Sequence, residues 1–331
     1  MEYRYLGASG LQISALSYGS WITMTDQMTE DDAMACMQIA YEAGVNFFDT
    51  SESYGGGQAE QVLGNILRRS GWKRTDVVIA TKLFWGGDGP NDKGLSRKHI
   101  VEGARASLAR LQLDYVDLIY CHRPDLHTPI EETVRAMNWL LDQGLAFYWG
   151  TSEWSAGQIM EAHAVARREH LVPPLMEQPL YNMFAREQVE REYARLYETV
   201  GLGLITYSPL AGGLLSGKYA EGVPNDSRAT LTQFDWLLHD RYHSEIAKQN
   251  IEKVKQLTPI ATELDCSMAQ LALAWCLKNP QVSSAVTGAS RPEQVAENMQ
   301  ALDVLSKLDD AAMARIEEIL QNKTDPEADF R

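Results

Sequence analysis

The sequence predicts an α/β protein, a (β/α)8 TIM barrel preceded by an N-terminal β-hairpin, and three observations lead to that class. Eight short apolar runs, typical of buried parallel strands, alternate with longer segments whose apolar residues recur at helical spacing. Eight repeats are more than an open doubly wound sheet normally contains, and the glycine fingerprint of such sheets is missing. The 331 residues, 45% of them hydrophobic, show no convincing boundary, so a single domain is expected over residues 1–331.

The expected elements follow in chain order. Two extended runs, residues 2–5 and 11–13, flank the Gly/Ser turn at 7–10 and predict the hairpin. The expected barrel strands are residues 15–18, 45–49, 77–82, 116–121, 146–151, 175–178, 203–208 and 284–288. Amphipathic segments between them predict helices at 31–43, 58–69, 97–111, 130–143, 155–168 and 268–278.

Residues that favour helix starts support this division. Thr29 precedes three acidic residues, and Ser96 precedes a long periodic run, so both are expected to cap a first turn. The polar stretch 222–243 lies between the seventh and eighth strands and is expected to cross the barrel mouth, anchored by Phe234 and Trp236.

Composition narrows the function classes. The chain has 30 basic and 45 acidic residues, a net charge of −15, which disfavours nucleic acid and anionic membranes as partners. No apolar stretch approaches the roughly 20 residues that span a bilayer, and patterned sequence begins at once without a signal peptide, so membrane insertion is not expected and the expected compartment is cytoplasmic. The cysteines are scattered without a C-x-x-C pair, and no metal site is expected: they are Cys36, Cys121, Cys266 and Cys276.

Four polar residues sit at or just past the ends of expected strands. Asp49, Lys82 and His122 end or follow the second, third and fourth strands, and Tyr54 follows Asp49 after a short loop. Because the carboxyl ends of parallel barrel strands meet at one rim, these side chains are expected to converge there. A carboxylate, an ammonium, a phenol and an imidazole together can deliver a proton.

Two glycine-rich segments were compared with phosphate-binding motifs. Gly55–Gly57 is followed by Glu60 where the dinucleotide fingerprint needs its third glycine, so these glycines are expected to serve a turn. Gly212 and Lys218 have P-loop spacing, but Tyr219 replaces the hydroxyl that would coordinate magnesium, so ATP hydrolysis is disfavoured and another nucleotide's phosphate is the better fit.

A Cys121–His122 nucleophile and base pair is also disfavoured, because consecutive residues of a strand point to opposite faces. A TIM-barrel hydrolase that uses paired carboxylates is a weak alternative, since no second acid accompanies Asp49 among the four residues. Proton delivery to a carbonyl is the chemistry that fits these residues best.

The segments around these four residues resemble those of a known family. Asp49-Thr50, Tyr54-Gly55, Ala80-Thr81-Lys82 and His122-Arg123-Pro124-Asp125 resemble the catalytic tetrad and its flanks in the aldo-keto reductase superfamily. Longer segments over residues 3–302 are most similar to the voltage-gated potassium channel β-subunit family: 84–87, 94–100, 131–137, 148–152 and 208–211. The resemblance implies a single aldo-keto reductase barrel domain that binds NADPH/NADP+.

The resemblance also implies where the cofactor would lie. Ser152 and Gln178 would hold the carboxamide, Tyr207 would stack on the nicotinamide, and a loop ending at Lys218 would surround the pyrophosphate. Lys218 and Ser290 would suit a 2′-phosphate, which favours NADPH over NADH. The full set of implied cofactor residues is Ser20, Trp21, Gln27, Asp49, Lys82, Ser152, Gln178, Tyr207, Ser208, Pro209, Leu210, Ala211, Gly212, Lys218, Arg228, Gly288, Ser290, Gln294, Glu297 and Asn298.

Group chemistry assigns roles to the four residues. Reduction of a carbonyl needs hydride on carbon and a proton on oxygen, and a free phenol with a pKa of about 10 is a reluctant acid. Lys82 is expected to lower the pKa of Tyr54, the proton donor, and Asp49 to hold the ammonium in place. His122 is expected to orient the carbonyl as a neutral hydrogen-bond donor. Any one of these residues alone would be read as a helix cap or as barrel packing.

The sequence therefore favours NADPH-dependent reduction of small aldehydes or ketones to alcohols, with an aromatic entrance that includes Trp21 and Trp85. The alternative is an NADPH-binding regulatory β-subunit that docks on a potassium channel cytoplasmic domain with little turnover. Animal members of that family have asparagine where this chain has His122, whereas most reductases of the superfamily have histidine, so the enzyme is favoured. The resemblance also implies a homotetramer.

Overall fold

The computed structural model describes residues 1–21, 28–222 and 243–325. Two implied cofactor residues, Gln27 and Arg228, lie outside the described residues, as do the expected anchors Phe234 and Trp236. The expectation of a crossing segment at 222–243 therefore stays a prediction.

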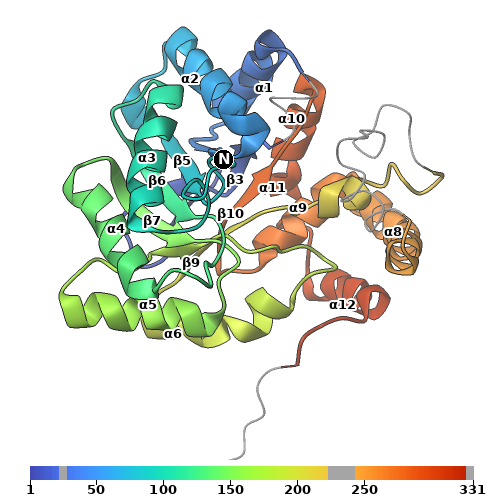
Figure 1. Cartoon of the computed structure of the whole chain (residues 1–331). Coiled ribbons are helices and arrows are strands. Elements are labelled where there is room, and N and C mark those ends of the chain that lie inside the picture. The colour runs from blue at the N-terminus through green and yellow to red at the C-terminus, as the bar shows by residue number, and fades with distance from the viewer. Residues whose placement is uncertain (22–27, 223–242, 326–331) are drawn as a thin grey trace, which may run out of the picture.

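Eight parallel strands close into a barrel, which confirms the predicted fold class. Each strand pairs with the next along the chain, and the last pairs with the first (Figure 1). The strands are β3 (Leu16–Gly19), β4 (Phe47–Asp49), β5 (Val78–Leu83), β6 (Val116–Cys121), β7 (Ala146–Thr151), β8 (Met176–Glu177), β9 (Gly203–Thr206) and β10 (Val282–Thr287).

Several strand boundaries differ from the prediction by one or two residues: β4 begins two residues later and β9 ends two residues earlier than expected. β10 begins at Val282, two residues before the expected start, because the pairing with β9 shifts register between Val282 and Ser284 and takes in the extra residues. β8 has only two residues, although Leu175 and Gln178 on either side still donate backbone hydrogen bonds to β7. The ladder between β7 and β8 is thus longer than the strand assignment.

The predicted hairpin is confirmed as β1 (Tyr3–Tyr5) and β2 (Gln12–Ser14), which pair antiparallel. Leu6 and Ile13 of this hairpin are fully buried and pack with interior side chains of the barrel, among them Phe47 and Leu118. The hairpin therefore closes the end of the barrel opposite the carboxyl ends of the strands.

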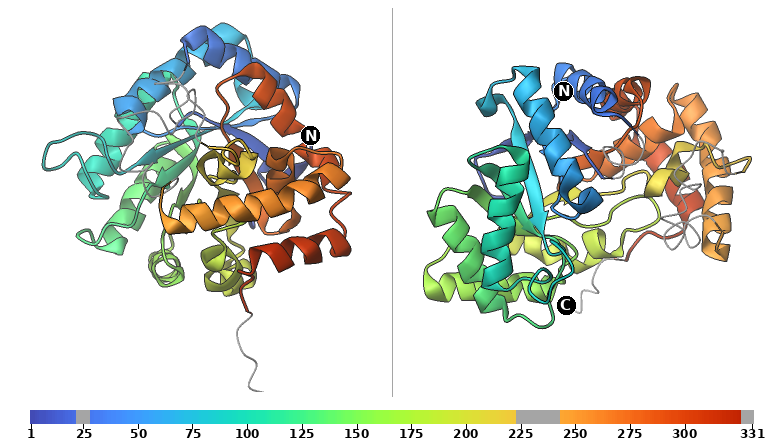
Figure 2. Two further views of the ribbon diagram at one scale, coloured as in Figure 1. Left: turned by 90° about the vertical axis from the view of Figure 1, so that its right-hand side faces the viewer. Right: turned by 45° about the horizontal axis from the view of Figure 1, so that its top comes forward.

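Helices surround the barrel on the outside (Figures 1 and 2). The six predicted helices are present within two residues of their expected limits: α1 (Glu30–Glu42), α2 (Gln58–Ser70), α3 (Arg97–Leu111), α4 (Ile130–Asp142), α5 (Ala156–Glu169) and α9 (Met268–Lys278). Further helices in the described residues were not predicted in full: α6 (Ala194–Val200), α8 (Glu245–Glu263), α10 (Pro292–Met299), α11 (Ala301–Val304) and α12 (Asp310–Leu320). No helix in the described part of the chain has the length and apolar character needed to cross a bilayer.

Both predicted helix caps are confirmed. The Thr29 side chain accepts from the amide of Asp32, whose carboxylate accepts from the amide of Thr29, and the Ser96 hydroxyl accepts from the amide of His99. These caps fix where α1 and α3 begin.

Strand alternation decides which side chains enter the barrel. Ala80 and Tyr120 pack in the interior cluster, so Lys82, two residues beyond Ala80 on β5, has the same inward orientation. Cys121, next to Tyr120, belongs instead to the cluster between strands and helices. Burial raises the pKa of the Cys121 thiol well above its usual range, which leaves it a poor nucleophile.

Candidate functional site

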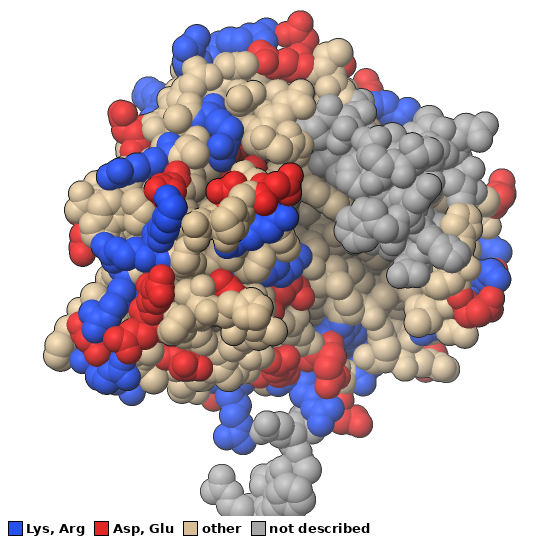
Figure 3. Space-filling view, in the orientation of Figure 1, with Lys and Arg blue, Asp and Glu red and all other residues tan. Residues whose placement is uncertain are grey.

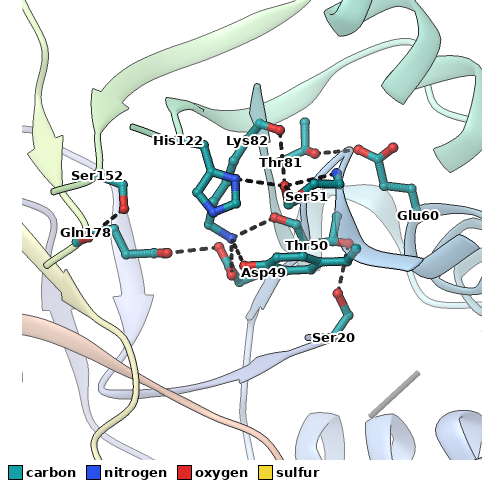
Figure 4. Close-up of polar contacts among 12 residues, drawn as sticks. Ser20, Asp49, Thr50, Ser51, Glu60, Thr81, Lys82, His122, Ser152 and Gln178 are labelled. Carbon is teal, nitrogen blue, oxygen red and sulfur yellow. Dashed lines mark hydrogen bonds and ion pairs between the residues drawn. The ribbon is translucent and has the colours of Figure 1, made fainter. Parts of the chain in front are cut away.

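Asp49, Lys82 and His122 lie together at the carboxyl ends of β4, β5 and β6 (Figure 4), and Tyr54 joins them through Lys82. Lys82 Nζ donates to Asp49 Oδ2 at 2.5 Å, to the carbonyl of Thr50 at 2.7 Å and to the hydroxyl of Tyr54 at 3.3 Å. The His122 ring lies edge-on to the Tyr54 ring, with centroids 5.9 Å apart. Lys82 and Asp49 are buried, so their contact excludes water.

The glycines after Tyr54 make a turn, as predicted, and carry the chain into α2. Gly55, Gly56 and Gly57 have φ of 58°, 63° and 93°, values that side chains rarely adopt. A Cβ on Gly57 would also lie 2.7 Å from the Arg110 side chain. The turn allows Tyr54, at its first position, to reach back to Lys82.

The pKa of Tyr54 departs from the expectation. Burial raises the pKa of Tyr54 above its usual 10.0, and although the nearby ammonium of Lys82 lowers it, the burial effect is larger. Burial also opposes the charge on Lys82, but Asp49 and Tyr54 outweigh that effect and the pKa of Lys82 is raised. The expected lowering by Lys82 is thus present, but the opposing effect of burial, which the sequence could not show, is larger.

His122 is neutral at physiological pH. Burial, together with the positive charges of Lys82 and Arg123, holds the pKa of His122 well below 6.5. A neutral imidazole carries one N–H, so its use as a donor depends on which nitrogen holds that proton.

Ser51 is the hydrogen-bond partner of His122 Nδ1. The Ser51 hydroxyl lies 3.0 Å from His122 Nδ1 and 3.3 Å from the carbonyl of Lys82. That carbonyl already accepts from the amide of Glu52, and the Ser51 oxygen itself accepts from the amide of Ser53. The Ser53 hydroxyl, 3.0 Å from the Ser51 oxygen, can donate to it or accept from it. When Ser51 donates to Nδ1, the proton of the neutral imidazole lies on Nε2. Nε2 makes no hydrogen bond within the described residues, so its proton is available to a substrate.

The residues expected at the carboxamide end of the cofactor connect to the same cluster. Gln178 Nε2 donates to Asp49 Oδ1 at 3.1 Å, and the hydroxyl of Ser152 donates to the carbonyl of Gln178 at 2.8 Å. Ser20, also expected near the cofactor, donates to the hydroxyl of Thr50 at 2.8 Å. The structure thus brings three implied cofactor residues beside the Asp49–Lys82 pair.

The segment after β9 has the backbone of an anion-binding loop. Ser208 and Ala211 have φ of 51° and 49°, and the glycines at 212, 213 and 217 also have positive φ. Successive residues of this kind turn backbone amides toward one side, which suits a pyrophosphate. Lys218 at the end of the loop is exposed, with its ammonium 5.1 Å from the centre of the Tyr219 ring. The amides of Ala211, Gly213 and Leu215 already donate to carbonyls of this loop, so the pyrophosphate site stays a prediction.

The expected adenosine end lies after β10, at the start of α10. The amide of Ser290 donates to Gln294, Gly288 and Glu297 are exposed, and Asn298 is buried. Pro292 begins α10, so the helix start predicted there is confirmed. The remaining implied residues Trp21, Tyr207, Pro209 and Leu210 lie in the loops after β3 and β9.

Sequence reasoning missed two residues of this site. The sequence alone assigns no role to Ser51, and it marks Arg123 only as a neighbour of His122 in the chain. Arg123 Nη1 donates to the carbonyl of His122 at 2.6 Å and to the Ser152 hydroxyl at 3.2 Å. Their positions beside Asp49 and His122 were the only signal that could have found them.

A buried carboxyl lies on the outer face of β8, behind the site. Thr151 donates to Glu177 Oε2, and Oε1 has no hydrogen-bond partner in the described part of the chain. Burial raises the pKa of Glu177 to about 8, so the group is largely protonated at neutral pH.

A (β/α)8 barrel with a lysine, a tyrosine, an aspartate and a histidine at its carboxyl rim defines a TIM-barrel enzyme architecture in which proton transfer is the available chemistry. This chain belongs to the aldo/keto reductase family, whose sequence pattern it matches over residues 15–321. Members of that family are oxidoreductases that generally bind NAD(P)H. The family predicted from the sequence is confirmed.

Two curated relatives are similar to this chain over almost its whole length. One from Oryza sativa subsp. japonica, named "Probable voltage-gated potassium channel subunit beta", is 56% identical over 324 residues, which cover 98% of each chain. One from Arabidopsis thaliana with the same name is 54% identical over 324 residues, again 98% of each chain. The predicted similarity to potassium channel β-subunits is confirmed as well.

Proposed function

We propose that this protein reduces aldehydes or ketones to alcohols with NADPH, and that Tyr54 donates the proton. The observation that carries this proposal is the hydrogen-bond chain from Asp49 through Lys82 to the Tyr54 hydroxyl, with neutral His122 beside it. Membership of the aldo/keto reductase family supports an oxidoreductase.

The proton step follows from the charges around the phenol. Tyr54 holds its proton at neutral pH because burial raises its pKa, so the acid form is fully populated. As the carbonyl oxygen gains negative charge it becomes a better base than the phenolate, and the proton moves from Tyr54 to that oxygen. The ammonium of Lys82, 3.3 Å from the hydroxyl, stabilises the phenolate left behind. Asp49 holds Lys82 in place and balances its charge.

His122 orients the carbonyl. With Ser51 donating to Nδ1, the Nε2 proton of His122 can bind the carbonyl oxygen next to Tyr54. Two donors on one oxygen fix the position of the carbonyl carbon and polarise it.

NADPH, when bound, supplies the hydride. Ser152 and Gln178 would bind its carboxamide beside Asp49, the positive-φ loop after β9 would bind the pyrophosphate, and α10 would approach the adenosine. Lys218 and Ser290 are the candidates for the 2′-phosphate, which favours NADPH over NADH.

The test is NADPH consumption with a panel of aldehydes and ketones, with the alcohol identified as product. We expect one alcohol formed for each NADPH consumed. If NADPH binds stoichiometrically and no carbonyl compound is reduced, the reductase proposal fails.

In that case the second candidate function leads: an NADPH-binding β-subunit of a voltage-gated potassium channel. The printed names of the two plant relatives favour it. Its test is a pull-down of cytoplasmic channel segments with and without NADPH. For either function we propose a homotetramer in the cytoplasm, and sedimentation in solution tests the tetramer.

A further inference from the structure

Arg123 places a positive charge beside the site just described. It follows His122 directly and is half-buried. Its guanidinium carbon lies 5.7 Å from the centre of the Trp85 ring and 6.0 Å from the centre of the Tyr207 ring. One nitrogen, Nη1, is held by the His122 carbonyl and the Ser152 hydroxyl, so the side chain has a fixed position.

This guanidinium has no carboxylate partner in residues 1–21, 28–222 and 243–325. Other partly buried arginines there are paired: Arg74 with Asp117, Arg110 with Glu60 and Arg186 with Glu190 and Glu317. Nε and Nη2 of Arg123 also make no hydrogen bond within those ranges. A partly desolvated charge with unused donors gains most from an anion that brings matching acceptors.

The charge lies close to the atoms that would react. Arg123 is near enough to lower the pKa of His122 and to oppose the rise in the pKa of Tyr54. The His122 ring also lies edge-on to Trp85, with centroids 5.0 Å apart, so His122 and Arg123 share one aromatic neighbour. His122 and Arg123 therefore border the same part of the barrel rim, next to Trp85.

We propose that Arg123 is a substrate-binding residue that selects carbonyl compounds carrying a carboxylate, so that the favoured substrates are aldehyde acids or oxo acids. This inference rests on the proposed reductase function. A guanidinium presents two parallel N–H donors that match the two oxygens of a carboxylate, and the Trp85 ring lies beside this guanidinium. The preference for an anionic substrate would come from Arg123 itself and not from the overall charge, because the protein carries a net charge of −15. On the face in Figure 3, positive and negative side chains are interspersed.

The test compares 2-, 3- and 4-carboxybenzaldehyde with their methyl esters, which keep the ring and the aldehyde but lack the charge. For the wild type we expect kcat/KM for the best acid to exceed that for its ester by roughly 10- to 100-fold, the range expected of a hydrogen bond to a charged group. Arg123→Gln should lower kcat/KM for the acids much more than for the esters and so bring the acid-to-ester ratio close to one, and Arg123→Lys should keep part of that ratio.

Arg97→Gln is the matched control. Arg97 is an exposed arginine at the start of α3 that also lies over an aromatic ring, 5.8 Å from the centre of Trp139, outside the site. The Arg97→Gln substitution removes the same charge from the protein and should leave the ratio of kcat/KM for the acid to that for the ester unchanged.

An acid-to-ester ratio near one in the wild type overturns the inference and leaves the reductase proposal intact. An equal loss for acids and esters in Arg123→Gln also overturns it, since that result indicates a structural role. If Arg123→Gln does not fold, the wild-type ratio and Arg123→Lys decide. If no carbonyl compound is reduced, the test is calorimetric binding of benzoate to the NADP+ complexes of the wild type and of Arg123→Lys. Tight binding by the wild type that the substitution weakens supports the anion site. Equal binding by the two proteins, or no binding, refutes it.

Discussion

Replacing Ser51 with alanine tests how the orientation of the substrate is controlled. The substitution removes the hydroxyl 3.0 Å from His122 Nδ1 and leaves the Lys82 carbonyl with its other donor, the amide of Glu52. Without that donor the imidazole proton is free to move to Nδ1, and Nε2 then faces the carbonyl oxygen as an acceptor. One neutral hydrogen bond contributes about 0.5–1.5 kcal/mol, so kcat/KM should fall roughly 2- to 12-fold.

The tautomer can be observed directly. In the wild type, nitrogen-15 NMR of His122 should show a protonated Nε2 and an unprotonated Nδ1, and Ser51→Ala should shift this balance. Ser53→Ala is the matched control, because the Ser53 hydroxyl contacts Ser51 at 3.0 Å but has no contact with His122. In a His122→Asn background the Ser51→Ala change should cost nothing further. The assignment would be refuted if His122 of the wild type is protonated on Nδ1. It would also be refuted if Ser51→Ala lowers kcat/KM as much in the His122→Asn background as in the wild type.

Two further predictions concern pH. Glu177 has a pKa of about 8 in the folded protein and an ordinary value of 4.5, so unfolding favours the ionised form and stability should fall as pH rises from 4.5 to about 8, by at most ~5 kcal/mol. Glu177→Gln should flatten this dependence, as measured by urea unfolding at both ends of that range, and a mutant curve parallel to the wild type would contradict it. The pKa of His122 lies well below 6.5 and that of Tyr54 above 10.0, so both keep their working protonation states between those values and kcat/KM for reduction should show no titration there. A bell-shaped profile within that interval would mean that one of these two groups titrates in it.

Much of this architecture could be read from the sequence because local patterns and tertiary packing agree. In β4, which ends at Asp49, and in β5, which contains Lys82, side chains alternate between the barrel interior and the helix layer. Because the strands are parallel, their carboxyl ends meet at one rim. The caps Thr29 and Ser96 worked for the same reason, since each bonds an amide three residues away. Short-range rules suffice for such contacts.

The features that were missed depend on contacts between distant residues. The pairing of Ser51 with His122 joins residues 71 positions apart, and no pattern in the loop marks it. The net rise in the Tyr54 pKa comes from burial, whereas the sequence showed only that a lysine could be near. Arg123 was overlooked because nothing local reveals that an arginine lacks a carboxylate partner.

The most direct test of the account is the rate of NADPH consumption by Tyr54→Phe with a good aldehyde substrate. Tyr41→Phe is the matched control, because the Tyr41 hydroxyl donates to Asp76 at 3.4 Å, outside the barrel rim. Loss of one positioned general acid should lower kcat by about 10²- to 10⁴-fold, while NADPH binding and the activity of Tyr41→Phe stay at the wild-type level. Equal turnover by Tyr54→Phe and the wild type would contradict the account, because the proton would then come from another group.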